Sequence, residues 1–274
     1  MKGKTIRRPS RLTRHSSLAG LWVASLGLYL FALLPLVALL LRISPAAFVR
    51  RLGEPVVRQA LALSLGTSVA ATVLCVLLGL PAAYLLARQR FPGREWLDTI
   101  VDLPITVPPV VAGVGLLLLF GRMGLLGRYL EAAGIRVAFT PLAVVLAQAF
   151  VAMPFFVKAA RSGFQALDPE LEAIARTLGA DRWQVWRRIT LPLCRPALLA
   201  GVTLAWSRAM SEFGATLMFA GNLPGRTQTL PLAVMSAMEV DLDTALSLSA
   251  ITLAVAGAAL ILAKWLLSGE EVEW

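Results

Sequence analysis

The chain has 274 residues, of which 58% are hydrophobic and only 15% are charged, and its mean hydropathy is +0.74. This composition excludes an ordinary water-soluble domain, whose surface carries more charge. The net charge of +10 is spread along the chain and does not form the dense patch that nucleic acid binding needs. A single histidine and two cysteines argue against a zinc site, histidine-based catalysis and a disulfide framework.

Apolar segments long enough to cross a hydrocarbon core recur along the chain, so the sequence predicts an all-α membrane protein with six transmembrane helices. The expected spans are 18–41, 61–87, 103–121, 137–157, 196–223 and 244–263. Six spans place both termini on the same side of the membrane. We therefore expect a basic tail over 1–17, a transmembrane domain over 18–268 and a short tail over 269–274.

The distribution of basic residues predicts that both tails are cytoplasmic. With the N-terminus inside, the inner segments hold 17 of the 26 Lys and Arg residues, a bias that the positive-inside rule describes. The basic start resembles the first region of a signal peptide, but the apolar stretch that follows is too long for a cleaved signal. We interpret it as an uncleaved first span.

The third expected span begins with an unusual cluster of prolines. Pro104, Pro108 and Pro109 fall in its first turns and predict a kinked or partly unwound end. Gly113, Gly115 and Gly121 follow, which is typical of a face where helices approach closely. The span is either a packing helix with a distorted start or a helix that lines a translocation path.

The fifth expected span contains two charged residues, Arg208 and Glu212, four positions apart. This spacing places both on one helix face, where they can form an ion pair. Charges inside a membrane are costly when they face lipid, so both side chains should face protein or water. The pair is either a structural salt bridge or part of a gate.

A charged segment, DPELEAIARTLGADRWQVWRRITLP, interrupts the apolar pattern over 168–192. Asp168 and Pro169 are typical of a helix start, as are the acidic Glu170 and Glu172. The sequence predicts an apolar stripe on this first helix, a stop at Gly179, a second helix capped by Asp181 with Gln184, and an end at Pro192. The two predicted stripes are Leu171, Ile174, Ala175 and Leu178, then Val185, Trp186 and Ile189. An interfacial helix or a solvated connection are simpler interpretations.

This segment resembles the cytoplasmic loop of permease subunits of binding-protein-dependent ABC importers. That loop has Glu-Ala-Ala, three residues, Gly, nine residues and Ile-x-Leu-Pro, and the match from Gly179 to Ile189, Leu191 and Pro192 is complete. At its front the chain has Ala173, Ile174 and Ala175, with Glu172 one residue early. The resemblance implies that Glu172, Ala173, Ala175, Gly179, Ile189, Leu191 and Pro192 couple the permease domain to an ATPase.

Two further stretches resemble the sulfate, molybdate and tungstate permeases. They are DLPITVPPVVAGVGLLLLFGRMGLLG over 102–127 and SEFGATLMFAGNLPGRTQTLP over 211–231, and the stretch over 211–231 resembles molybdate permeases more closely than sulfate permeases. The chain has no G-x-x-x-x-G-K-[ST] motif, so ATP must be bound by a partner and no cofactor is expected in this chain.

The resemblance implies a type I importer in which two copies form a pore, served by two ATPase subunits and an extracytoplasmic oxyanion-binding protein in a prokaryotic cell membrane. Candidates for the path or gate are Thr106, Pro108, Ser211, Glu212 and Thr216, and Arg226 is a candidate for steering an anion or docking the binding protein. A sulfate or thiosulfate importer is the nearest alternative. An ion-coupled secondary transporter is less favoured, because the chain shows no internal repeat and offers Glu212 alone as an intramembrane acid.

Overall fold

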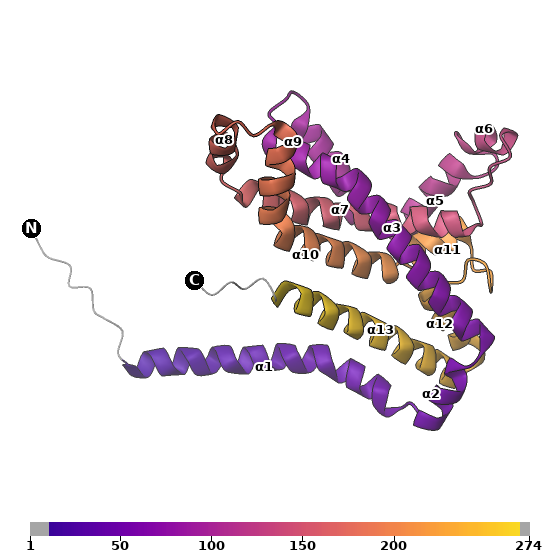
Figure 1. Cartoon of the computed structure of the whole chain (residues 1–274). Coiled ribbons are helices and arrows are strands. Elements are labelled where there is room, and N and C mark those ends of the chain that lie inside the picture. Colours follow the sequence, from indigo (N-terminus) through magenta and orange to yellow (C-terminus); the bar gives the residue numbers. More distant parts are fainter. Residues whose placement is uncertain (1–10, 269–274) are drawn as a thin grey trace, which may run out of the picture.

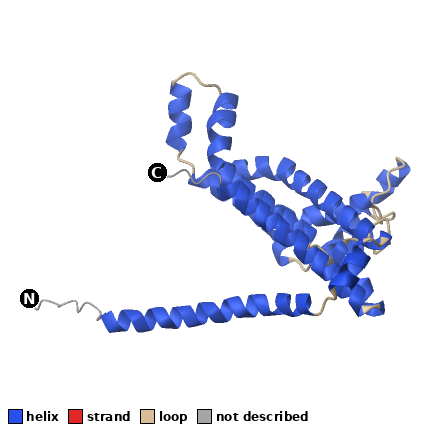
Figure 2. Cartoon of the chain, turned by 60° about the horizontal axis from the view of Figure 1, so that its bottom comes forward, coloured by secondary structure: helices blue, strands red, loops and turns tan. Residues whose placement is uncertain are grey.

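A computed structural model describes residues 11–268, and this part of the chain is helical without strands (Figures 1 and 2). The helices are α1 (Arg11–Leu41), α2 (Pro45–Leu52), α3 (Pro55–Arg88), α4 (Arg94–Thr106), α5 (Pro109–Phe120), α6 (Gly127–Ala132) and α7 (Pro141–Ala166). They continue with α8 (Pro169–Thr177), α9 (Arg182–Val185), the π-helix η1 (Trp186–Thr190), α10 (Leu191–Met210), α11 (Gly214–Ala220), α12 (Leu230–Val240) and α13 (Leu242–Ser268).

Among the described residues, four helices are long and apolar enough to cross a membrane: Pro55–Arg88, Pro141–Ala166, Arg182–Met210 and Leu242–Leu262. A fifth span arises if α4 and α5, which are bent by 114° at a short break, are counted together. The expected all-α membrane class is therefore confirmed. The helix α1 begins at Arg11, within the expected basic tail over 1–17; residues 1–10 and the expected tail over 269–274 lie outside the described residues.

Proline determines where many of these helices begin. It occupies one of the first two positions of α2, α3, α5, α7, α8 and α12, where its missing N–H has no partner to lose and its fixed φ suits a helix. Prolines inside α3, α4 and α7 are accommodated without ending those helices. The same residue type thus predicts helix starts better than it predicts helix ends.

Two expected spans differ in extent from the observed helices, although the kink predicted at the prolines of the first is confirmed. The span expected over 103–121 is divided into α4 and α5 at Val107 and Pro108, because consecutive prolines remove two N–H donors from the helix. The span expected over 196–223 ends at Met210, and a separate short helix, α11, follows after a three-residue break. Both interruptions bear directly on the functional site.

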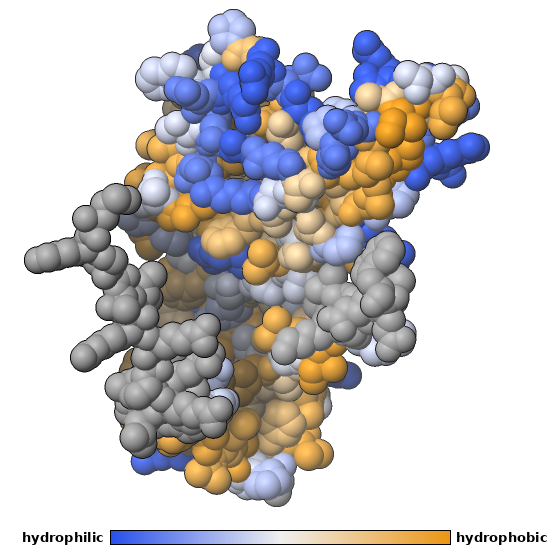
Figure 3. Space-filling model, turned by 90° about the vertical axis from the view of Figure 1, so that its left-hand side faces the viewer, coloured by the Kyte–Doolittle hydropathy of each residue, from blue (hydrophilic) through white to orange (hydrophobic). Residues whose placement is uncertain are grey.

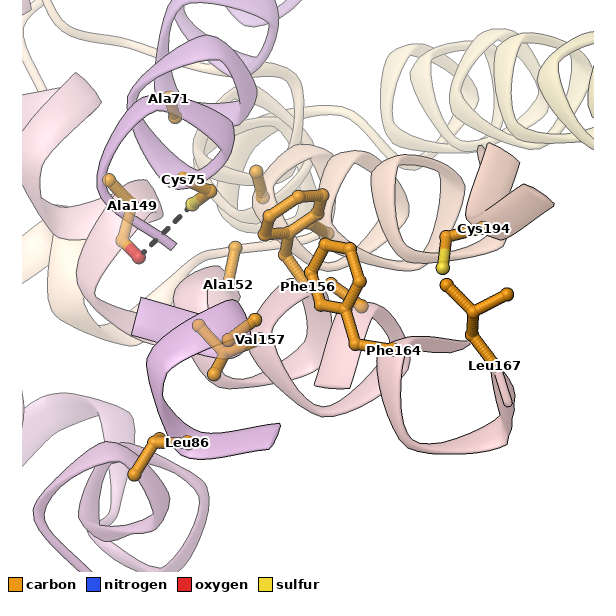
Figure 4. Packing of buried hydrophobic residues seen from close by; sticks show 14 residues of the cluster. Ala71, Cys75, Leu86, Ala149, Ala152, Phe156, Val157, Phe164, Leu167 and Cys194 are labelled. Atoms are coloured by element: carbon orange, nitrogen blue, oxygen red, sulfur yellow. Dashed lines mark hydrogen bonds between the residues drawn. The ribbon is translucent and has the colours of Figure 1, made fainter. Parts of the chain in front are cut away.

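The core is formed by α3, α7 and α10, and Figure 4 shows its buried side chains. Phe156 and Phe164 of α7 lie at its centre. The thiol of Cys75 in α3 donates a hydrogen bond to the carbonyl oxygen of Ala149 at 3.5 Å. The thiol of Cys194 in α10 donates to the carbonyl oxygen of Gly163 at the same distance. Both cysteines are buried and free, and they act as packing residues of the core.

Glycines allow the three core helices to approach closely. A Cβ atom on Gly79 of α3 would lie 2.7 Å from the ring of Phe156, and one on Gly163 of α7 would lie 2.4 Å from the Cβ of Ala197 in α10. Small residues at such contacts are what helix association in lipid requires. The tight core is therefore a property of particular glycines and not of hydrophobicity alone.

Polar contacts between side chains fasten α2 to the start of α13. Arg51 donates to Asp241 at 2.6 Å and also to Thr244, whose hydroxyl donates to the Asp241 carboxylate. The Thr244 hydrogen bond, with further help from Arg51, lowers the pKa of Asp241 below its usual value. This corner of the fold is held by polar contacts where the apolar core ends.

We expect Gly163→Ala to lower the free energy of unfolding by about 1–3 kcal/mol, because its new methyl group overlaps Ala197. The matched control is Gly66→Ala in α3, whose Cβ would meet nothing within 4 Å. That change should leave stability unchanged or raise it by up to about 1 kcal/mol. Thermal unfolding of both variants in one detergent measures the difference, and equal unfolding midpoints would contradict this account of the core.

Candidate coupling segment and translocation path

The charged segment 168–192 folds at the end of the molecule where α1 begins and α13 ends (Figure 1). Asp168 caps α8 by accepting a hydrogen bond from the backbone N–H of Glu170 at 2.9 Å, as the sequence predicted. Asp181 and Gln184 form the predicted capping box at the start of α9. Gly179 has a φ of 91°, a left-handed conformation that favours glycine, and it follows the end of α8.

The predicted end of the second helix at Pro192 was wrong. The chain runs from α9 through the π-helical turn η1 into α10 without a break, and Pro192 lies in the first turn of α10. In η1 the N–H of Leu191 bonds to the carbonyl of Trp186, five residues back. The elements α9, η1 and α10 therefore form one continuous helical run over Arg182–Met210.

Glu172 fastens α8 to the rest of the protein. Its residue surface is only 7% exposed, and Oε1 accepts a hydrogen bond from Thr190 at 2.8 Å and pairs with Nη2 of Arg88 at 3.4 Å. Arg88 ends α3 and Thr190 ends η1. The carboxylate thus joins three elements and points inward, so within this chain it positions α8.

The opposite side of α8 is apolar and exposed. Leu171 is 43% exposed, Ile174 is 55% exposed and Leu178 is 83% exposed, whereas Ala175 of the same predicted stripe is buried. We call Leu171, Ile174 and Leu178 the outer face of α8. Of the other sequence candidates, Ala173, Gly179 and Pro192 are exposed, and Ile189 and Leu191 are half-buried. An apolar face that its own chain leaves uncovered is typical of a contact surface.

Aromatic packing supports the second half of the segment. Trp186 of η1 meets Tyr84 of α3 edge to face, with ring centroids 4.6 Å apart, and lies 5.6 Å from Phe164 of α7. Tyr84 and Phe164 also meet edge to face at 5.4 Å. Such pairs stabilise beyond the area they bury. The segment therefore stands on a rigid aromatic base that links α3, α7 and η1.

The interrupted helices form the second candidate site. The half-helices α5 and α11 pack closely, since a Cβ atom on Gly113 would lie 2.7 Å from the carbonyl oxygen of Ala215 and one on Gly214 would lie 3.2 Å from Pro109. Of the three glycines expected to form a close face, Gly113 does so, whereas Gly115 has no neighbour within 4 Å of its Cβ position. The break at Pro108 thus lies beside the break between α10 and α11.

Arg208 and Glu212 form the predicted ion pair, with Nη2 and Oε2 2.8 Å apart. Glu212 is 1% exposed, and its other oxygen accepts a hydrogen bond from the backbone N–H of Ala215 at 2.8 Å. It therefore satisfies a free donor in the first turn of α11. The Arg208 side chain is 25% exposed. The ion pair and the backbone contact of Glu212 together join the end of α10 to the first turn of α11.

The remaining path candidates lie in different environments. Thr106 and Pro108 are exposed at the α4–α5 break, and Ser211 is exposed at the α10–α11 break. Thr216 is fully buried, and its hydroxyl has no partner, so it does not reach the surface of this chain. Arg226 is exposed in the loop between α11 and α12. The structure brings the two breaks together, and Arg226 belongs to a separate loop.

Sequence reasoning missed Arg88, Thr190 and the aromatic base. Nothing local marks these residues as partners of Glu172, since Arg88 is 84 positions away. It also missed Gln148 of α7, which is fully buried with neither amide atom bonded. A glutamine inside an apolar span was the available signal. The helices α2, α6 and α12 were missed because they are short and lie between the apolar runs.

The bent pair of α4 and α5 and the broken helix formed by α10 and α11 lie among helices apolar enough to cross a membrane, which is the architecture of a multi-pass membrane protein. The chain matches the family model described as "Binding-protein-dependent transport system inner membrane component" over residues 76–268. It belongs to this family, and it is the permease subunit of an ABC importer, without a catalytic site of its own.

Several relatives support this assignment. The chain is 46% identical to "Molybdenum transport system permease protein ModB" of Mycobacterium tuberculosis (strain ATCC 25618 / H37Rv) over 82% of this chain and 86% of that protein. It is 41% identical to the protein of the same name from Escherichia coli (strain K12), over 76% and 92%. It is also 40% identical to "Sulfate transport system permease protein CysW" of Synechococcus elongatus, over 70% and 67%.

Solved structures show the same fold at low sequence identity. A bacterial ABC transporter involved in the import of the acidic polysaccharide alginate matches with a TM-score of 0.74 at 17% identity, over 96% of this chain and 100% of that chain. The MetNI methionine ABC transporter matches with a TM-score of 0.57 at 16% identity, over 78% and 93%. The fold is that of an ABC importer permease.

We expect Glu172→Ala to detach α8. Removing one partner of a buried ion pair costs about 3 kcal/mol, so opening of α8 should become about a hundredfold more frequent. Hydrogen exchange of the amides in α8, measured by mass spectrometry in the assembled transporter, reports this opening. The matched control is Glu170→Ala, which removes an exposed acid from the same turn. Equal exchange in both variants would show that Glu172 does not hold the helix.

Proposed function

We propose that this chain forms the pore of an ATP-driven importer of tetrahedral oxyanions, with molybdate or tungstate as the transported anion. The support is the identity of 46% and 41% to molybdenum permeases, together with the match of the stretch over 211–231. Sulfate permeases are also similar, at 40% and 36% identity. Sulfate or thiosulfate transport by the same architecture is therefore the second candidate.

We infer an inner-membrane topology with six spans and both ends in the cytoplasm. The spans would be α1, α3, the bent pair α4 and α5, α7, the continuous run from α9 to α10, and α13. The start of α1, the end of α13 and the pair α8 and α9 lie towards one end of the molecule, and α2, α6 and α12 lie towards the other (Figure 1). The excess of Lys and Arg in the inner segments favours the first end as cytoplasmic.

The observation that carries the coupling proposal is the two-sided character of α8. Its inner side is fixed by Glu172, and its outer face offers exposed Leu171, Ile174 and Leu178. An amphipathic helix of this kind docks in a groove of a partner. We propose that the partner is an ATPase subunit, that two permease copies and two ATPases assemble, and that Gly179 permits the turn between α8 and α9.

The contacts of Glu172 and of the aromatic base would carry a movement of the ATPases into the membrane helices. Closure of the ATPases on ATP would move α8 and α9 as one body, because Glu172 and the aromatic base join them to α3 and η1. The continuous helix from η1 to α10 would carry the movement to the break at Ser211. The breaks beside Thr106, Pro108 and Ser211 would then move towards or away from the same breaks in the second permease copy. This change would open the pore between the two copies to one side of the membrane at a time, which is alternating access.

The path is expected to hold the anion weakly, since a tight site would retain it. Thr106, Pro108 and Ser211 are exposed at the breaks and are our candidates for lining. We assign Glu212 to the gate, because it holds α11 against α10. Thr216 is buried, so we assign it to the layer of side chains that supports the residues lining the path. Arg226 is a candidate for attracting the anion or its binding protein, and selectivity would rest with that protein.

We expect ATP hydrolysis by the reconstituted transporter to rise when its binding protein carries molybdate or tungstate, and to remain at the basal rate when that protein carries sulfate. The binding protein's anion preference, measured by calorimetry, should show the same order. Stimulation by the sulfate-loaded protein alone would overturn the substrate assignment. Transport that continues without ATPase subunits and collapses with an ion gradient would instead support a secondary transporter.

A further inference from the structure

A basic cleft of about 1440 Å³ lies between the end of α3, the loop that follows it, and the inner sides of α8, α9 and η1. Five arginines line it: Arg88, Arg90, Arg94, Arg176 and Arg182. Glu172 is the one acidic lining residue, and it is already engaged by Arg88. Within residues 11–268, Arg90, Arg94 and Arg182 have no ion-pair partner. The cleft therefore carries an uncompensated positive charge.

The cleft is separate from the proposed ATPase contact. Successive residues of an α-helix turn by about 100°, so Pro169, Glu172 and Arg176 share one side of α8. These three line the cleft. Leu171, Ile174 and Leu178 of the outer face lie on the opposite side and do not line it. A partner docked on the outer face would leave the cleft open from the other side.

The surroundings of the cleft are those of a membrane boundary. Leu77, Leu78 and Leu85 of α3 are 66%, 55% and 41% exposed and form an apolar strip that leads towards Arg88. Tyr84, Trp183 and Trp186 line the cleft itself, and Trp183 is 65% exposed. Aromatic side chains of this kind are enriched where lipid meets water. In Figure 3 hydrophilic residues gather in the upper part of this face, where α8 and α9 lie.

We propose that the cleft binds the phosphate headgroup of an anionic phospholipid, with acyl chains lying along the exposed leucines of α3. Arginine side chains recognise phosphate oxygens through charge-assisted hydrogen bonds. Basic pockets between membrane helices on the cytoplasmic side suit anionic headgroups. In the orientation proposed above, the lipid comes from the cytoplasmic leaflet.

A free tetrahedral anion shares the headgroup's chemistry but uses only half of the site. Molybdate or inorganic phosphate would contact the arginines and leave uncovered both the apolar strip on α3 and the aromatic side chains Tyr84, Trp183 and Trp186 that line the cleft. A phospholipid covers both. A bound headgroup would also bridge α8, α9 and the end of α3, the elements that Glu172 joins. The lipid would then strengthen the connection on which coupling depends.

The test uses the assembled transporter in phosphatidylcholine vesicles that contain either brominated phosphatidylglycerol or brominated phosphatidylcholine. Bromine on the acyl chains quenches nearby tryptophan fluorescence, and Trp183→Phe identifies the signal that comes from the cleft. We expect stronger quenching of Trp183 by the anionic lipid than by the neutral one. The double variant Arg90→Gln with Arg182→Gln should weaken the apparent affinity for phosphatidylglycerol by about thirtyfold.

The matched control is Arg187→Gln with Arg188→Gln, which removes two exposed arginines from η1 that lie outside the cleft. It should keep the preference of the unaltered protein. Equal quenching by the two lipids, or an equal loss in the control, would overturn the proposal. Displacement of the quenching lipid by inorganic phosphate or molybdate at low concentration would assign the cleft to a free anion. None of these outcomes bears on the anion assay above, so the two proposals fail independently.

Discussion

The hydrogen-bonded ion pair at Glu172 is the constraint on which the end of this permease formed by α8, α9 and η1 depends. A carboxylate on α8 is held by Arg88 from α3 and by Thr190 from η1, and all three side chains are largely buried. A short amphipathic helix is marginal by itself in water. This contact, together with the aromatic base around Trp186, gives α8 a fixed orientation and so decides which of its sides faces outward.

Among the apolar helices, by contrast, the main feature is that two of them are interrupted. Consecutive prolines separate α4 from α5, and Glu212 supports the restart of the chain at α11. Freed backbone groups in a membrane are tolerated only where neighbours or a cavity satisfy them. The close approach of α5 and α11 at Gly113 supplies neighbours for both half-helices. Two ion pairs, Lys158 with Asp102 at 3.0 Å and Arg161 with Asp98, fasten α4 to α7 beside the first break.

Local signals predicted local structure well in this protein. The caps at Asp168 and Asp181, the stop at Gly179 and the Arg208–Glu212 pair all depend on residues within a few positions of one another. The inward orientation of Glu172 was not predictable, because it depends on Arg88 in a distant helix. The helix end predicted at Pro192 was wrong, because the chain continues through η1 into α10 and a proline in the first turn of a helix is tolerated. The path residues lie at the breaks, but only their packing distinguishes exposed Ser211 from buried Thr216.

We propose that α8 is fixed through its inner side and contacts the ATPase through its outer face. Maleimide labelling of single cysteines tests this directly, because the native Cys75 and Cys194 are buried. Ile174→Cys and Leu178→Cys should react readily in the permease alone and become protected once ATPase subunits assemble, whereas Arg187→Cys should react equally in both states. Continued reactivity at positions 174 and 178 in the assembled transporter would contradict the account.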